Sequence, residues 1–243
     1  MKRVQSFEES RRRRSLLFKL LKYVAILFLL FELFTAFAYK SLIVGSSSMK
    51  PTISPGDRVI VATSAYGVLN PFTGRRAVFK APQRGDMVLM NLPSSKARSW
   101  HHRFLDSVFR FVTFQRLGAP GYGSAHKDVP VIKRVVAGPG DTVMMEGFIV
   151  YVKAVGSAHF LTEYELSGGD YDIVGGQLVE GWTKDMPLAG SMNALDLGPD
   201  EFFVVGDNRY ASSDSRFYGS VLSSELIGRI VLRYWPLDRM MKL

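Results

Sequence analysis

The sequence predicts a mainly β protein, in which an antiparallel, barrel-like domain carries a smaller β-rich subdomain and follows one N-terminal transmembrane helix. The first observation is an apolar segment at residues 23–39 that is long enough to span a bilayer. The second is a series of short apolar segments in residues 40–243 that follow glycine-containing turns. Such short strands at turn-separated intervals are typical of antiparallel sheets and barrels rather than of βαβ units.

The composition is that of a folded protein with an uneven positive charge. Of its 243 residues, 47% are hydrophobic and 12% are aromatic, which is ample for a core. The net charge is +9, and residues 1–22 alone contribute +6 of it. Because no aromatic residues interrupt the arginine run there, a nucleic-acid-binding module is not expected. The chain has no cysteine, which excludes disulfides and thiolate chemistry.

The N-terminal segment predicts how the chain is oriented at a membrane. Residues 1–22 are expected to be a cytoplasmic basic segment, and residues 23–39 a transmembrane helix about 25 Å long. Residues 40–243 then form the extracytoplasmic catalytic domain. A cleavable signal peptide is the alternative, because Ala36-Phe37-Ala38 imitates a cleavage site. The length of the apolar run favours a retained anchor.

Turn sequences predict the strands of the exported part. Each combines glycine with aspartate and precedes an apolar segment: Pro55-Gly56-Asp57 before residues 58–62, Arg84-Gly85-Asp86 before residues 87–90, and Gly138-Pro139-Gly140-Asp141 before residues 142–145. Glycine and aspartate are favoured in tight turns, and the segments that follow have the residue types of strands.

Two regions interrupt this pattern, and one charge interrupts the predicted span. Residues 94–128 are an insertion in which residues 100–117 have the periodicity of a basic amphipathic helix, suited to a lipid interface or to packing on the domain. Residues 146–200 are predicted to form the smaller β-rich subdomain. Glu32 is expected to be protonated or to face a partner helix, because a charged carboxylate costs about 2.5–3.5 kcal/mol in the bilayer.

Three serines directly after the apolar segment are candidates for nucleophilic chemistry. Residues 46–48 are all serine, and a Met-x-Pro-Thr turn follows them. A serine becomes a nucleophile only where a base removes its proton and donors hold the resulting oxyanion. On its own the segment favours a flexible linker over a nucleophile.

Lys133 is the candidate base. In a strand over residues 130–137, Lys133 and Arg134 point to opposite faces, so one of the two cations must face apolar neighbours. Burial lowers the pKa of a lysine and allows the neutral amine to act as a general base toward a serine. The alternative is an edge-strand lysine that prevents aggregation.

A polar loop at residues 206–216 follows the apolar segment 202–205 and is suited to orienting groups beside a site. It contains two aspartates, which also suggest an acid pair or a metal site. Because the four histidines show no recognisable ligand spacing, no metal is expected.

Together these stretches resemble the sequence boxes of bacterial type I signal peptidases, the membrane-bound serine proteases that remove signal peptides from exported proteins. The similar segments are Ser46-Ser47-Ser48-Met49-Lys50-Pro51-Thr52, Arg84-Gly85-Asp86, residues 132–141, and residues 206–216. They occur in the family order, after the expected anchor. Gly45, Ser47 and Tyr210 depart from the family pattern without removing a proposed catalytic group.

The resemblance implies a role for each site residue and no cofactor. Ser48 is the nucleophile and Lys133 the general base, while the Ser46 hydroxyl and the Ser48 backbone N–H form the oxyanion hole. The supporting residues are Ser212, which orients the lysine, Asp214 and Arg216, which pair to hold the loop, and Asp207 and Arg209. The residues expected to line a pocket for small side chains are Met49, Ile53, Val131 and Ile132.

The function implied is a membrane-anchored serine endopeptidase that cleaves signal peptides after small residues (A-x-A) through an acyl-enzyme. It would lie in the bacterial cytoplasmic membrane with its catalytic domain on the periplasmic side. Its partners would be signal peptides of exported preproteins, the lipid bilayer and the translocation machinery, and not nucleic acid. The alternative is a catalytically silent, membrane-anchored β-domain that binds exported peptides or assists translocation. A pure binder needs no set such as Ser48, Lys133 and Ser212.

Overall fold

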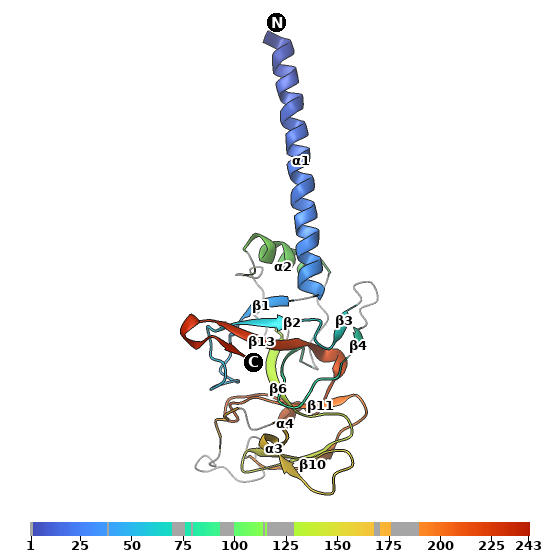
Figure 1. Cartoon of the computed structure of the whole chain (residues 1–243), viewed down its shortest axis with the longest axis vertical. Helices are drawn as coiled ribbons and strands as arrows, with labels where there is room; N and C mark the ends of the chain where they lie inside the picture. Colours follow the sequence, from blue (N-terminus) through green and yellow to red (C-terminus); the bar gives the residue numbers. More distant parts are fainter. Residues whose placement is uncertain are drawn as a thin grey trace.

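The structure is a computed structural model of the chain, and it describes residues 2–37, 39–69, 76–78, 80–92, 100–113, 115, 129–167, 171–175 and 190–243. A long N-terminal helix stands on one end of a body built mainly from antiparallel sheets (Figure 1). The predicted mainly β class with a curled antiparallel sheet is therefore confirmed.

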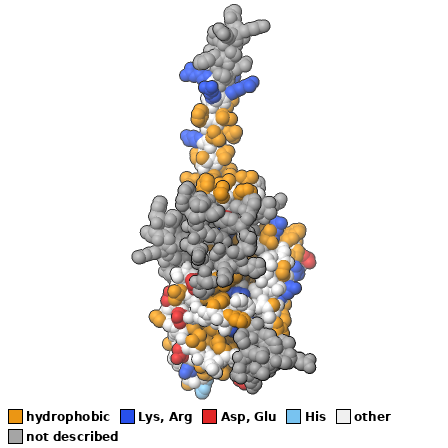
Figure 2. All heavy atoms as spheres, turned by 180° about the vertical axis from the view of Figure 1, so that it is seen from behind, with side chains coloured by type: hydrophobic (Ala, Val, Ile, Leu, Met, Phe, Trp, Pro, Cys, Tyr) orange, Lys and Arg blue, Asp and Glu red, His pale blue; other side chains and the backbone are white. Residues whose placement is uncertain are grey.

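Helix α1 (Lys2–Phe37) projects away from the sheets, and the large apolar side chains along it are mostly exposed. Figure 2 shows these hydrophobic side chains along the helix, with lysines and arginines toward its far end. Among the residues that the structure describes, no helix is long and apolar enough to cross a membrane, so the structure does not show the predicted span at residues 23–39. Tyr39, predicted to end that span, instead begins strand β1 because its backbone pairs with Ala62.

The largest sheet has eight strands in the order β1-β2-β13-β5-β6-β11-β12, with β14 paired to β13. Their bounds are β1 (Tyr39–Ile43), β2 (Arg58–Ala62), β5 (Met87–Met90), β6 (Val131–Ala137), β11 (Glu201–Val205), β12 (Val221–Leu222), β13 (Leu226–Trp235) and β14 (Met241–Lys242). Strands β2 and β5 coincide with the predicted segments 58–62 and 87–90. Strands β3 (Gly67–Leu69) and β4 (Arg76–Val78) form a separate pair.

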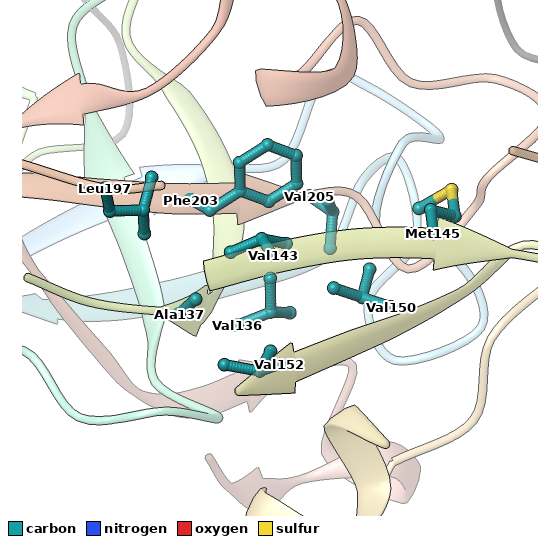
Figure 3. Packing of buried hydrophobic residues seen from close by; sticks show 9 residues of the cluster. All are labelled: Val136, Ala137, Val143, Met145, Val150, Val152, Leu197, Phe203 and Val205. Carbon is teal, nitrogen blue, oxygen red and sulfur yellow. The ribbon is translucent and has the colours of Figure 1, made fainter. Parts of the chain in front are cut away.

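A second, four-stranded sheet has the order β10-β7-β8-β9 and lies at the end of the molecule away from α1 (Figure 1). Its strands are β7 (Thr142–Glu146), β8 (Ile149–Lys153), β9 (Leu161–Thr162) and β10 (Met192–Asp196), and helix α3 (Glu163–Ser167) follows β9. The sheet begins before residue 146, where the smaller subdomain was expected to begin. Its side chains pack against β6 and β11 in one shared apolar cluster (Figure 3).

The glycine–aspartate turns before β2, β5 and β7 share one local structure. In each turn the glycine has a positive φ, 90° at Gly56, 90° at Gly85 and 78° at Gly140, a conformation that side-chain-bearing residues rarely adopt. In each, the following aspartate accepts a hydrogen bond from the backbone N–H three residues before it, at 2.8–3.0 Å. This repeated turn explains why the Gly-Asp pattern predicted the strands.

The remaining helices are short, apart from α2 (Trp100–Val112), which lies beside the lower part of α1 (Figure 1). The short ones are α4 (Ser215–Tyr218), η2 (Ser223–Glu225) and η3 (Leu237–Arg239). Helix α2 falls within the predicted amphipathic stretch 100–117, of which residues 114, 116 and 117 lie outside the described residues.

Strand β6 is the central element for the site. It pairs with β5 on one side and with β11 on the other, so residues 133–137 are all buried. A strand in this position delivers both of its cations, Lys133 and Arg134, into the protein interior.

Candidate active site

The three serines lie between β1 and β2 in a packed segment. Ser48 is 7% exposed, and Met49 beside it is fully buried. The backbone N–H of Asn208 donates to the Ser48 carbonyl oxygen at 3.0 Å, and the Asn208 side-chain amide donates to the Ser47 carbonyl oxygen at 3.3 Å. The serine segment is therefore fastened to the 206–216 loop, which a flexible linker would not be.

Gly206 lies where the serine segment meets that loop. A Cβ atom at this position would clash with the Ser212 side chain and with the Ser48 carbonyl oxygen. Glycine is thus required here by space, and its small size lets the Ser48 backbone approach the Ser212 side chain.

Lys133 is connected to the loop through hydroxyl and carboxylate groups. Its side chain is buried, and Nζ donates to Ser212 Oγ at 2.8 Å. Ser212 Oγ in turn donates to Asp214 Oδ2 at 2.6 Å. Asp214, the N-cap residue of α4, also accepts from the Gly206 backbone N–H and pairs with Arg216 Nε at 2.8 Å.

The surroundings favour a neutral lysine. Burial lowers the pKa of Lys133 to about 8, although the negative charge of Asp214 acts in the opposite direction. The Arg216 charge opposes that effect and so helps to keep the lysine pKa low. Burial alone would raise the pKa of Asp214, but the hydrogen bonds and charge of Arg216 hold it below its ordinary value. Asp214 is therefore a carboxylate that accepts a hydrogen bond from the Ser212 hydroxyl.

The proposed nucleophile and base are close in the fold but are not hydrogen-bonded. Among the described residues, no hydrogen bond joins the Ser48 hydroxyl to Lys133 Nζ. The Ser48 backbone N–H donates to Ser46 Oγ at 3.2 Å, so the two expected oxyanion donors are adjacent. In active sites without substrate, catalytic hydrogen bonds are often long and tighten only when substrate binds.

Asp207 and Arg134 form a second polar cluster beside Lys133. Arg134 donates from Nε and Nη2 to the Asp207 carboxylate at 2.8 and 2.7 Å, and the Thr52 hydroxyl donates to the same carboxylate at 2.5 Å. Arg134 also donates to the Gly85 carbonyl oxygen at 2.8 Å. The sequence predicted that one cation of β6 would face apolar neighbours; both are buried, and Arg134 is neutralised by Asp207.

Arg209 pairs with Glu163, a residue that the sequence did not indicate. Both side chains are fully buried, and two hydrogen bonds of 2.8 and 2.6 Å join the guanidinium to the carboxylate. Arg209 Nε also donates to the Gly206 carbonyl oxygen at 2.9 Å. Glu163 begins α3, so this pair fastens the loop to the second sheet. No sequence motif surrounds Glu163. The one available signal is general: a buried arginine such as Arg209 requires a carboxylate partner, without indicating which one.

Tyr171 is the second residue that the sequence did not indicate. Its hydroxyl donates to Glu163 Oε2 at 2.6 Å, and its ring lies 3.9 Å from the guanidinium carbon of Arg134. It therefore connects the Arg209–Glu163 pair to the Arg134–Asp207 pair. Like Glu163, it lies in the stretch 146–200, whose function the sequence left open.

Three of the four predicted pocket residues lie together. Met49, Ile53 and Ile132 belong to one apolar cluster, in which Met49 and Ile53 are fully buried. Val131 packs in a different cluster, because neighbouring residues of β6 point to opposite faces. Within the described residues, no group of three histidine or acidic side chains has the arrangement of a metal site.

Comparison with known proteins identifies the family. A family model described as "Signal peptidase, peptidase S26" matches residues 17–235. The chain belongs to the signal peptidase family. This confirms the family suggested by the sequence boxes, and the enzyme class expected from it, a peptidase.

The similar curated proteins carry related names. The chain is 25% identical to signal peptidase I P of Bacillus subtilis subsp. natto over 235 residues, covering 96% of this chain and 97% of that protein. It is 28% identical to signal peptidase I of Leptolyngbya laminosa, covering 80% of this chain and 68% of that protein. It is 26% identical to probable signal peptidase I-2 of Synechocystis sp., covering 80% of this chain and 62%, less than two thirds, of that protein.

Proposed function

We propose that this protein is a Ser/Lys endopeptidase that removes signal peptides from exported preproteins. The observation that carries the proposal is the buried Lys133, with its pKa near 8, beside the fastened Ser48 segment. An amine that is about half neutral at pH 8 can take a proton from a serine hydroxyl, whereas an ordinary lysine is almost wholly protonated there.

The reaction then follows general base catalysis. Neutral Lys133 removes the Ser48 Oγ proton as the oxygen attacks the scissile carbonyl carbon, which forms a tetrahedral intermediate. The Ser48 backbone N–H and the Ser46 hydroxyl donate to its oxyanion; the contact between these two groups in the structure has to open for this to happen. Protonated Lys133 gives its proton to the leaving amine, and water hydrolyses the acyl-enzyme with the lysine again as base.

Ser212 is proposed to orient the lysine. Because the Ser212 O–H donates its hydrogen bond to Asp214, a lone pair of Ser212 Oγ is left to accept one N–H of Lys133 Nζ. This fixes the direction of the amine and leaves its lone pair for Ser48. Arg216 holds Asp214 in place. The ion pairs of Asp207 with Arg134 and of Arg209 with Glu163 hold the loop at residues 206–216.

The substrate and the membrane location rest on the apolar features. Ile132, the partly exposed residue that packs on Met49 and Ile53, would contact small apolar side chains of a signal peptide, in line with cleavage after A-x-A. Exposed apolar side chains along α1 support an anchor in the bacterial cytoplasmic membrane, with the basic N-terminus in the cytoplasm and the catalytic domain on the other side. Ser48 follows β1 closely, so the site would lie near the bilayer surface.

The test is cleavage of a preprotein by the full-length protein in detergent micelles. Wild-type protein is expected to release a mature protein whose N-terminus follows A-x-A, while Ser48→Ala and Lys133→Met abolish cleavage. Ser47→Ala is the matched control and should retain it. Full turnover by both Ser48→Ala and Lys133→Met would refute the mechanism. Wild-type protein that binds signal peptides without cleaving them would favour the silent binding domain instead.

A further inference from the structure

Helix α2 packs across the part of α1 that lies nearest the sheets. Phe28 and Phe31 of α1 meet Phe111 edge-on with ring centroids 5.3 Å apart, and Phe28 also meets Phe104 at 6.1 Å. Ser107 Oγ donates to Glu32 Oε2 at 3.0 Å. The partner helix expected for Glu32 is therefore α2 of the same chain.

The outer face of α2, defined here as Leu105, Phe109 and Val112, is apolar and exposed. These side chains are 50%, 39% and 68% exposed. With 3.6 residues per turn, they lie within an arc of about 60° on the helix. Three large apolar side chains on so narrow an arc form a stripe rather than the scattered exposure normal for a surface.

Two charged side chains of α2 form an ion pair with each other. Asp106 and Arg110 form an ion pair of 2.7 Å one helical turn apart, at about 90° and 130° around the helix from the centre of the outer face. Asp106 is 8% exposed, so it is turned away from water. In surroundings of low dielectric constant, charged groups must be paired or hydrogen-bonded. The Asp106–Arg110 ion pair and the Ser107–Glu32 hydrogen bond meet this requirement.

We propose that α2 is an interfacial helix whose outer face inserts among lipid acyl chains beside α1. A lipid surface is the occupant because α2 packs on α1, whose own apolar side chains are exposed, for example Leu27 and Leu33 at 59% and 46%. This rests on the membrane anchoring in the proposed function. The two crossed helices would fix the height and tilt of the catalytic domain on the bilayer, which a single helix leaves free.

The absence of cysteine in the chain permits a direct test. Single-cysteine variants of the full-length protein, Leu105→Cys and Val112→Cys, carry an environment-sensitive fluorophore in phosphatidylethanolamine–phosphatidylglycerol vesicles with spin-labelled acyl chains. Leu27→Cys on α1 is the membrane reference. Val155→Cys, 71% exposed at a turn of the second sheet, is the aqueous reference. Labels at 105 and 112 are expected to be quenched as strongly as at 27, and the label at 155 to be unaffected.

The outcomes separate the proposal from the anchor. Quenching at 27 but not at 105 and 112 would overturn the interfacial helix and leave the anchor intact, whereas no quenching at 27 would refute the anchor as well. Unquenched labels together with cross-linking between Val112→Cys protomers would assign the face to a second copy of the chain and also overturn the proposal.

A functional readout uses the double variant Leu105→Gln with Val112→Gln, which changes no residue of the active site. It is expected to cleave a short soluble peptide at the wild-type rate and a membrane-inserted preprotein more slowly. Wild-type rates on both substrates would contradict the inference.

Discussion

Replacing Lys133 by Met is expected to stabilise the folded protein at neutral pH while it abolishes the proposed activity. Burial lowers the lysine pKa from 10.5 to about 8. At about 1.4 kcal/mol per pKa unit, the buried ammonium lowers the free energy of unfolding by about 3 kcal/mol at pH 7. Methionine fills a similar volume without charge, and loss of the hydrogen bond to Ser212 offsets about 1 kcal/mol. The net gain is about 2 kcal/mol.

The pH dependence gives this prediction its sign. Below pH 8 the lysine is protonated in both the folded and the unfolded state, so the full penalty of burying its charge applies. Between pH 8 and 10.5 the folded state loses the proton while the unfolded state keeps it, so the stability of the wild-type protein rises. Above pH 10.5 the amine is neutral in both states, and the advantage of methionine should have disappeared.

The assay is thermal unfolding of the full-length protein in detergent micelles, followed by near-ultraviolet circular dichroism at several pH values between 7 and 10.5. A gain of 2 kcal/mol raises the Tm of Lys133→Met by about 4–8 °C at pH 7. Lys153→Met on β8 is the matched control, and the gain in Tm at pH 7 is expected for Lys133→Met alone. A Lys133→Met protein that is less stable than wild type at pH 7, or whose advantage persists unchanged to pH 10.5, would refute the reasoning.

Three further predictions follow from the same site. The kcat/KM for a peptide substrate should rise with pH with an apparent pKa of about 8, because only neutral Lys133 is active; a profile flat from pH 6 to 9 would contradict this. Glu163→Gln leaves the Arg209 charge buried without its carboxylate and should lower the free energy of unfolding by about 3–5 kcal/mol in urea titrations. Glu163→Leu combined with Arg209→Met should recover most of that loss, and no recovery would argue against an uncompensated charge. Gly206→Ala should reduce kcat in a peptide assay, because the added Cβ clashes with the Ser212 side chain and the Ser48 carbonyl oxygen. Gly45→Ala, which has open space around its Cβ, should not reduce kcat.

Local features of the sequence predicted much of the fold. The strands after Gly56-Asp57 and Gly85-Asp86 were predictable because the turn is held by its own residues, the glycine conformation and the aspartate hydrogen bond. The end of α1 was not predictable from the sequence, because Tyr39 is equally suited to an apolar helix and to a strand. Only its pairing with Ala62, which is distant in sequence, decides between them.

The candidate site was predictable where chemistry and local pattern coincide, and not where tertiary contacts decide. The alternation of side chains in a strand indicated a buried cation at Lys133 or Arg134. It did not show that Asp207 would neutralise Arg134 and leave the lysine as the group with the lowered pKa. Glu163 and Tyr171 stand in no motif, since the carboxylate that meets a buried arginine is selected by how the second sheet packs.

The carboxylate of Asp207 has a consequence for how the protein is made. It gathers Thr52, Arg134 and its own loop, and its hydrogen-bond partners precede it by 155 and 73 positions. A ribosome therefore delivers the serine segment and the lysine strand well before the carboxylate that unites them. A chain still in synthesis carries Ser48 and Lys133 before this carboxylate has been made, so the proposed peptidase activity is expected to begin only after the loop at residues 206–216 has been translated and folded.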